Sequence, residues 1–146
     1  MSICIISNKS NLESHMSCSS FNYIRRCLAT SFDVNLGEIY GKLFSFVSKY
    51  PKEMSLEEVI SNTEKTKGEI IEYKMYHEDS KTQHVIEFLM DSDTNGRVNG
   101  RTCKVLKPYI ELMYKHMDQE TYDFYIKNTG FDKMFEDACD LGMSWK

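Results

Sequence analysis

Residues 36–50 carry the clearest helical pattern in the sequence. Their apolar side chains recur at the spacing of one helix face, and Pro51, which disfavours continuation of a helix, ends the pattern. The stripe consists of Leu36, Ile39, Tyr40, Leu43, Val47 and Tyr50, with Phe44 and Phe46 beside it. Such a helix is stable mainly when other elements cover its apolar stripe. The segment therefore predicts a packed helical domain.

Further segments show helical spacing together with signals for a helix start. Ser55 and Glu58 have the spacing of a capping box, and the same spacing recurs after Thr66 and Ser80. Gly142 follows the last apolar stripe and is typical of a helix end. We expect helices at about 20–33, 36–50, 55–60, 66–75, 80–90, 105–126 and 131–141.

The remaining segments are interpreted as connections. Residues 91–101 contain two Asn-Gly pairs and are expected to link two helices, and residues 1–18 are expected to form a flexible N-terminal arm. No segment predicts a strand convincingly. The expected fold of residues 19–146 is an all-α bundle of about seven helices, with short loops and roughly antiparallel neighbours.

Charge and cysteine content restrict the classes of partner. The chain has 18 Lys and Arg residues against 22 Asp and Glu residues, and the basic residues are scattered, which disfavours a nucleic-acid partner. Five cysteines without a CxxC pair are typical of reduced thiols, so we expect a cytoplasmic protein. No apolar run is long enough for a membrane anchor, and no secretory leader is expected.

Candidate catalytic residues are few and scattered. His77 stands beside two acidic residues but has no second histidine at metal-ligand spacing, and His116, between Lys115 and Met117, is interpreted as a surface or boundary residue. Cys27 and Cys103 each follow or precede a basic residue, although free cysteines are usually small buried apolar groups. We therefore expect no enzyme, no metal and no cofactor, and keep a small Cys-dependent enzyme as a third alternative.

The supply of apolar side chains exceeds what one helix face can hide. Phe44 and Phe46 lie outside the main stripe of residues 36–50, and the three segments that follow each add an apolar face. Residues at such spacing usually form core, and that alternative stays open for each of them. The excess favours an exposed apolar groove that accepts a helix of a partner protein.

Residues 126–135, IKNTGFDKMF, resemble the second homology motif of the Bcl-2 family, whose core is Asn-Gly-Gly-Trp-Asp-x-Phe. Phe131 stands at the position of the usual Trp. The order of the expected helices is also similar over about residues 19–142. The resemblance implies a Bcl-2-like bundle around a central hydrophobic hairpin, and the weak motifs and missing membrane tail are similar to relatives from poxviruses and iridoviruses.

The position of the family's first homology motif, Asn-Trp-Gly-Arg, has two alternatives. Residues 98–101 resemble it in letters, with Arg101 as the arginine, but they leave too few residues before Phe131 for two core helices. Placing the motif at residues 82–84 restores both helices and puts His84 at the position of the arginine that pairs with an Asp of the ligand. A histidine is only partly charged near neutral pH, so binding is expected to be weaker or narrower.

The resemblance implies a viral inhibitor of host apoptosis that sequesters pro-apoptotic BH3-containing proteins in a hydrophobic groove. Such a protein acts in the host cytoplasm, can be recruited to mitochondria through its partners, and can form a homodimer. The implied groove residues are Leu43, Phe46, Val47, Tyr50, Met54, Ile71, Met75, His84, Val85 and Phe88. The alternative is a Bcl-2-fold inhibitor of innate immune signalling of the NF-kappaB type, with a closed groove and a surface patch that binds a host adaptor.

Overall fold

Four short strands from distant parts of the chain form one antiparallel sheet. The computed structural model describes all 146 residues, with strands β1 (Ser2–Ser7), β2 (Glu13–Ser17), β3 (Gly96–Val98) and β4 (Met143–Trp145). The order in the sheet is β2-β1-β4-β3, so β4 lies between the N-terminal hairpin and the middle strand of the chain. In the register, Ile5 lies opposite Ser14 of β2 and Trp145 of β4.

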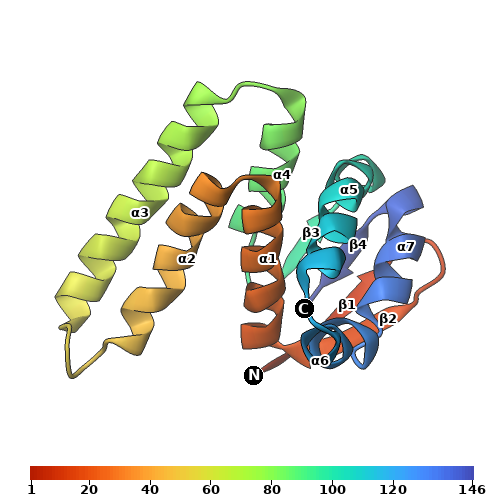
Figure 1. Cartoon of the computed structure of the whole chain (residues 1–146), viewed down its shortest axis with the longest axis horizontal. Coiled ribbons are helices and arrows are strands. Elements are labelled where there is room, and N and C mark those ends of the chain that lie inside the picture. Colours follow the sequence, from red (N-terminus) through yellow and green to blue (C-terminus); the bar gives the residue numbers. More distant parts are fainter.

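Helices make up most of the remaining chain (Figure 1). They are α1 (Cys18–Phe32), α2 (Val34–Ser48), α3 (Leu56–Tyr76), α4 (Ser80–Met90), α5 (Gly100–His116), α6 (Gln119–Tyr122), the π-helical turn η1 (Asp123–Lys127) and α7 (Phe131–Leu141). The prediction of a mostly helical chain is confirmed. The prediction that it lacks strands is wrong.

The N-terminal residues are not a flexible arm, as residues 2–17 form the β1–β2 hairpin. Ile3, Ile5 and Ser7 point inward and are buried, and Ser14 and Met16 do the same on β2. The error has a physical cause. The apolar run at residues 3–6 shows no alternation, and β2 is polar in sequence, so these strands are defined by their pairing partners rather than by local pattern.

Two helix boundaries also differ from the predictions. Thr66 does not start a new helix, because it lies inside α3 and its hydroxyl donates to the Asn62 carbonyl oxygen one turn earlier. The pattern at residues 105–126 is not one helix. α5 already begins at Gly100, which places Pro108 in its interior, and α6 begins after the N-cap Asp118.

The capping box of Ser55 and Glu58 is confirmed at the start of α3.

The helices divide into a body and an arm. α1, α5 and α7 pack with the sheet around Phe21, Leu106, Phe131 and Trp145, all essentially inaccessible to solvent. α2 and α3 form an antiparallel pair that projects from this body (Figure 1), which we call the α2–α3 arm. None of the helices has the length and apolar character needed to cross a membrane.

Candidate partner-binding cleft

A cavity of about 560 Å³ separates the α2–α3 arm from the end of α4 and the loop after it. Six apolar or aromatic side chains line it from α2 and α4: Tyr40, Leu43, Phe44, Val47, Leu89 and Met90. The polar part of its wall comes from Asn22, Thr63, Lys67 and residues 91–93. We call this cavity the arm cleft. Its volume lies within the usual range of binding pockets in proteins.

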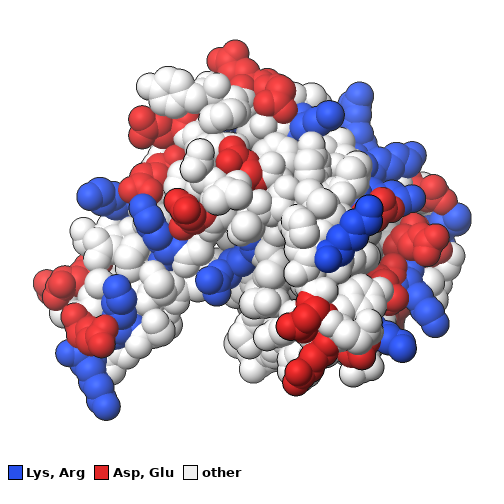
Figure 2. Space-filling view, viewed as in Figure 1, with Lys and Arg blue, Asp and Glu red and all other residues white.

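A second cavity adjoins the arm cleft. A neighbouring cavity of about 260 Å³ shares Asn22 and Phe44 with it and extends along α1 to Tyr125. Figure 2 shows the visible part of this region as a hollow between the arm and the body, with charged side chains of both signs scattered around it. The two cavities therefore adjoin each other between α1 and α2.

Exposed apolar side chains also lie on the arm, near in sequence to residues that line the cleft. Val47 lines the cavity although 66% of its surface is exposed, and Tyr50 follows one turn later, half exposed. On α3, Ile71 and Met75 follow Lys67 at helical spacing and are 57% and 68% exposed. The arm thus exposes more apolar surface than isolated surface residues account for.

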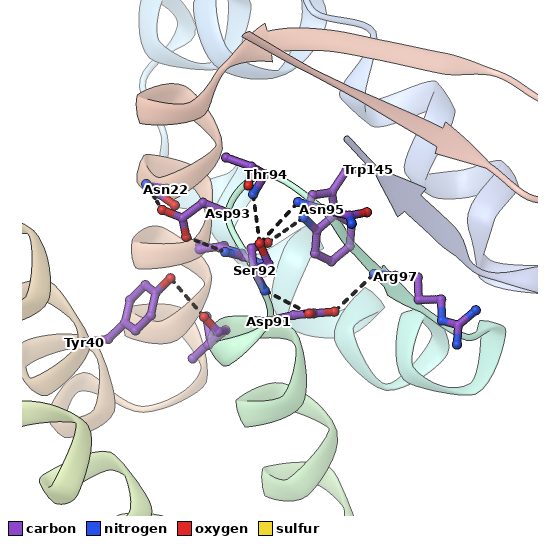
Figure 3. A network of polar contacts seen from close by, with 11 residues as sticks. Asn22, Tyr40, Asp91, Ser92, Asp93, Thr94, Asn95, Arg97 and Trp145 are labelled. Atoms are coloured by element: carbon purple, nitrogen blue, oxygen red, sulfur yellow. Dashed lines mark hydrogen bonds and ion pairs between the residues drawn. The ribbon is translucent and has the colours of Figure 1, made fainter. Parts of the chain in front are cut away.

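A polar network forms the wall of the cleft opposite the arm (Figure 3). Asp93 accepts hydrogen bonds from Asn22 at 3.4 Å and from Arg25 at 3.5 Å, both on α1. Asp91 accepts hydrogen bonds from the backbone N–H groups of Ser92 and Arg97. These contacts fix two carboxylates at the rim.

Arg25 is a fully buried cation behind this wall. Its guanidinium carbon lies 4.4 Å from the centre of the Phe21 ring, 5.2 Å from that of Phe88 and 5.3 Å from that of Trp145. The Nε and Nη2 atoms have no hydrogen-bond partner. Burial lowers the pKa of Arg25, whereas Tyr40 and Asp93 raise it. The aromatic faces partly replace the hydration that burial removes.

The spacing of Asp91, Asp93, Asn95 and Gly96 equals the start of a calcium-binding EF-hand loop. The resemblance does not extend to the ligands. Both Asp91 oxygens already accept backbone N–H groups, Asp93 turns toward the Arg25 cation, and the twelfth position is the buried Thr102 instead of a glutamate. These residues are accounted for by the polar network.

The structure places the ten expected groove residues in different environments. Leu43 and Val47 line the arm cleft, while Tyr50, Ile71 and Met75 lie on the exposed surface of the arm. Phe46 and Met54 are half-buried at the far end of the arm, where the Asn62 side chain contacts the Met54 sulfur at 3.6 Å.

The three α4 residues do not lie on an open surface. Val85 and Phe88 are fully buried, and Phe88 packs edge-on against Phe21 and Trp145. The His84 ring nitrogen Nδ1 lies 2.9 Å from the Thr102 hydroxyl on α5, and the residue is not among those that line the arm cleft. Core packing, the alternative left open from the sequence, holds for Val85 and Phe88.

Two of the separate candidate catalytic residues line one cavity. Cys27 and His116 both line a space of about 360 Å³ between α1, α5 and α6. No hydrogen bond joins them, and burial raises the pKa of the Cys27 thiol. Burial raises the pKa of Cys103 to about 12 as well. Both thiols are therefore protonated and weakly nucleophilic near neutral pH.

Sequence reasoning missed the polar half of the cleft. Asn22, Lys67, Asp91 and Asp93 come from three separate segments, and only the turn-rich composition of residues 91–101 marked one of them as a surface loop. The contact of this loop with α1 is a tertiary contact that no local sequence pattern predicts.

Comparisons with protein-family models, curated proteins and solved structures gave no match.

Proposed function

We propose that this chain is a protein-binding module that takes an amphipathic helix of a partner protein into the arm cleft. The observation that carries the proposal is the apolar floor of the cleft, which α2 and α4 form together and which continues onto exposed side chains of the arm. An amphipathic helix binds such a surface through apolar anchors at helical spacing. Val47 is the most exposed of these floor residues, at 66%.

The rim of the cleft defines the polar part of the partner. Asp91 and Asp93 stand on one side and Lys67 on the other. Carboxylates on the loop side favour a partner helix that carries a basic residue next to its apolar anchors. His84 does not face this cleft, so we expect the basic residue, rather than a ligand Asp at His84, to set the register of the partner.

BH3 segments of pro-apoptotic proteins are the partner class that the Bcl-2 resemblance implies, and inhibition of host apoptosis is the function that would follow. In this proposal the helices act as a Bcl-2-like bundle, and the four-stranded sheet is an addition to it. The arm cleft supports the proposal because α2 and α4 together supply six apolar or aromatic side chains to its lining.

Calorimetric titration with a panel of BH3 peptides tests this proposal. We expect submicromolar binding to one or a few peptides. Val47→Glu places a charge in the apolar lining of the cleft and should weaken binding by about 30-fold, the effect of losing roughly 2 kcal/mol. Leu141→Glu is the matched control, because Leu141 is 60% exposed on α7 and outside the residues lining the cleft.

If the folded protein binds none of the peptides in the panel, the BH3 proposal is contradicted. If Leu141→Glu weakens peptide binding as much as Val47→Glu does, the arm cleft is not the binding site. In either case circular dichroism of each variant must show the helical content of the parent chain, so that weakened binding is not mistaken for unfolding.

The second candidate is inhibition of innate immune signalling through a surface patch. The observation that favours it is the burial of Val85 and Phe88, which closes the α4 part of the expected groove. The exposed residues Ile71 and Met75 would then form the patch for an adaptor protein. An NF-kappaB reporter assay in host cells distinguishes the two: Met75→Glu should abolish inhibition, whereas Val47→Glu should leave it unchanged.

A further inference from the structure

The outer face of the β1–β2 hairpin brings together three side chains of different ligand types. Cys4 Sγ lies 3.8 Å from His15 Nε2, and the same nitrogen lies 2.9 Å from a carboxylate oxygen of Glu13. One ligand atom from each residue lies within 4.8 Å of the other two. We call these residues the hairpin cluster. It lies outside the arm cleft.

The register of the hairpin holds this cluster together. Cys4 lies directly opposite His15, and Glu13 is two residues from His15 on the same face of β2. The backbone N–H and C=O of Cys4 both bond to Lys146 on the other side of β1. Toward β2, Cys4 and His15 are therefore a pair without backbone hydrogen bonds, the arrangement in which facing side chains approach most closely.

The arrangement does not fit a catalytic triad. In a nucleophile–base–acid series, the acid binds the imidazole nitrogen that faces away from the nucleophile. Here the Glu13 carboxylate and the Cys4 sulfur both approach Nε2 of His15. Burial and the nearby Glu13 carboxylate raise the pKa of Cys4, and Lys146 opposes them, so the thiol is also poorly ionised without a cation.

Three ligands that converge on one point are instead the arrangement of a metal site. We propose that the hairpin cluster binds one Zn²⁺ through Cys4 Sγ, His15 Nε2 and a Glu13 carboxylate oxygen. Zinc accepts thiolate, imidazole and carboxylate ligands together, and three protein ligands leave a fourth position for water.

Two of the three distances between ligand atoms agree with tetrahedral zinc after a small adjustment, and the third lies within 4.8 Å. At ordinary bond lengths, sulfur and nitrogen ligands of one Zn²⁺ lie about 3.6 Å apart, and nitrogen and oxygen ligands about 3.4 Å. Cys4 and His15 are already close to the first value. The Glu13 carboxylate must move away from His15 by roughly half an ångström, and its exposed side chain is free to do so.

Binding exchanges a proton for the metal. Zn²⁺ takes the Cys4 sulfur as thiolate and the His15 Nε2 without its proton. The Cys4 proton leaves to solvent, the neutral imidazole keeps its proton on Nδ1, and the hydrogen bond between His15 and Glu13 is replaced by two bonds to the metal. Affinity should therefore rise with pH. Because the metal bridges β1 and β2 in the folded state only, zinc should also raise the melting temperature.

Titration of the tag-free full chain with Zn²⁺ alone, and with Co²⁺ as a spectroscopic probe, tests the proposal. We expect one metal ion per chain and a thiolate-to-cobalt charge-transfer band in the near ultraviolet. Cys4→Ser should remove the band, and Cys4→Ser and His15→Gln should each weaken zinc binding by at least about 10-fold, since loss of even an outer-shell partner costs that much.

Cys18→Ser is the matched control, because Cys18 is a half-buried thiol that is not part of the hairpin cluster. It should retain the band and the zinc affinity. Absence of stoichiometric binding by the folded parent chain would overturn the proposal, and so would a band that persists in Cys4→Ser. Glu13→Gln, which keeps the size of the side chain, should lower affinity without loss of the cobalt–thiolate band.

Discussion

The indole nitrogen of Trp145 donates a hydrogen bond of 2.7 Å to the carbonyl oxygen of Ser92. This contact joins β4 to the loop that forms the polar wall of the arm cleft (Figure 3). The Trp145 ring also packs edge-on against Phe21 and Phe88. The Trp145 side chain thus links the sheet to α1, to α4 and to the loop after α4.

Replacement of Trp145 should therefore loosen the fold and the loop together. Trp145→Ala is expected to lower the free energy of unfolding by about 3–5 kcal/mol, and Trp145→Phe by less, since it keeps an aromatic ring and loses the hydrogen bond. Urea denaturation followed by circular dichroism measures both, because Trp145 is the chain's single tryptophan and its fluorescence is lost with it. Equal stability of both variants and the parent would contradict this account.

Replacement of Gly142 and of Gly68 by alanine should change the stability of the fold in opposite directions. Gly142 has a φ of 93°, and an added Cβ would lie 2.3 Å from the Val98 carbonyl oxygen, so Gly142→Ala should destabilise the turn between α7 and β4. Gly68 lies within α3 with nothing within 4 Å of an added Cβ. Gly68→Ala should raise stability by about 0.5–1 kcal/mol. Thermal melts of the two variants make the comparison, and the account fails if both move the melting temperature the same way.

The stability of the fold should not require the buried charge of Arg25, but it should require the volume of the Arg25 side chain. Arg25→Met keeps most of the volume and removes a cation with two unpartnered nitrogens, so it should be neutral or stabilising by about 1–4 kcal/mol. Arg25→Ala leaves a cavity between aromatic rings and should cost about 2–5 kcal/mol. Urea denaturation of both variants decides the matter. A Met variant as unstable as the Ala variant would show that the charge itself is required.

Acid should destabilise the contact between the N-terminal hairpin and α7. The hydrogen bond from the buried Ser7 hydroxyl, together with those from Ser10, holds the pKa of Asp137 below its usual value. A carboxyl with a lowered folded-state pKa adds stability above its unfolded value of about 3.9, and that stability is lost as the pH falls through the folded value.

Asp137→Asn should therefore be less stable than the parent at pH 7 and should lose less stability between pH 5 and pH 3. The measurement is the free energy of unfolding at several pH values. Asp79 and Asp118, whose pKa values are lowered by hydrogen bonds at helix N-caps, remain in the variant, so part of the acid sensitivity should persist. Parallel pH profiles would contradict the role given to Asp137.

Local patterns predicted the helices well and the sheet not at all. The stripe from Leu36 to Tyr50 and the Ser55–Glu58 capping box are local signals, and the structure confirms helices α2 and α3 at these places. β2 is polar in sequence and β4 has three residues, so neither has a recognisable period. Their strand conformation depends on pairing with β1, which the sequence does not display.

The same limit applies to the sites. The helix stripe placed Leu43 and Val47 on one face, and both line the arm cleft. Cys4 and His15 meet only through the hairpin register. They stand eleven positions apart in the sequence, which is not a spacing that indicates a metal site. Because β2 was expected to be part of a flexible arm, the sequence did not predict the hairpin cluster.

The strand order β2-β1-β4-β3 also bears on how the chain folds. Helices and the β1–β2 hairpin form from neighbouring residues, but the pairing of Ile5 with Trp145 closes a loop that contains nearly all of the chain. The entropy lost on closing so long a loop is recovered only when the core around it is complete. The pairing of β1 with β4 should thus be the last step to become stable and the first to break on unfolding, with the α2–α3 arm able to persist after it.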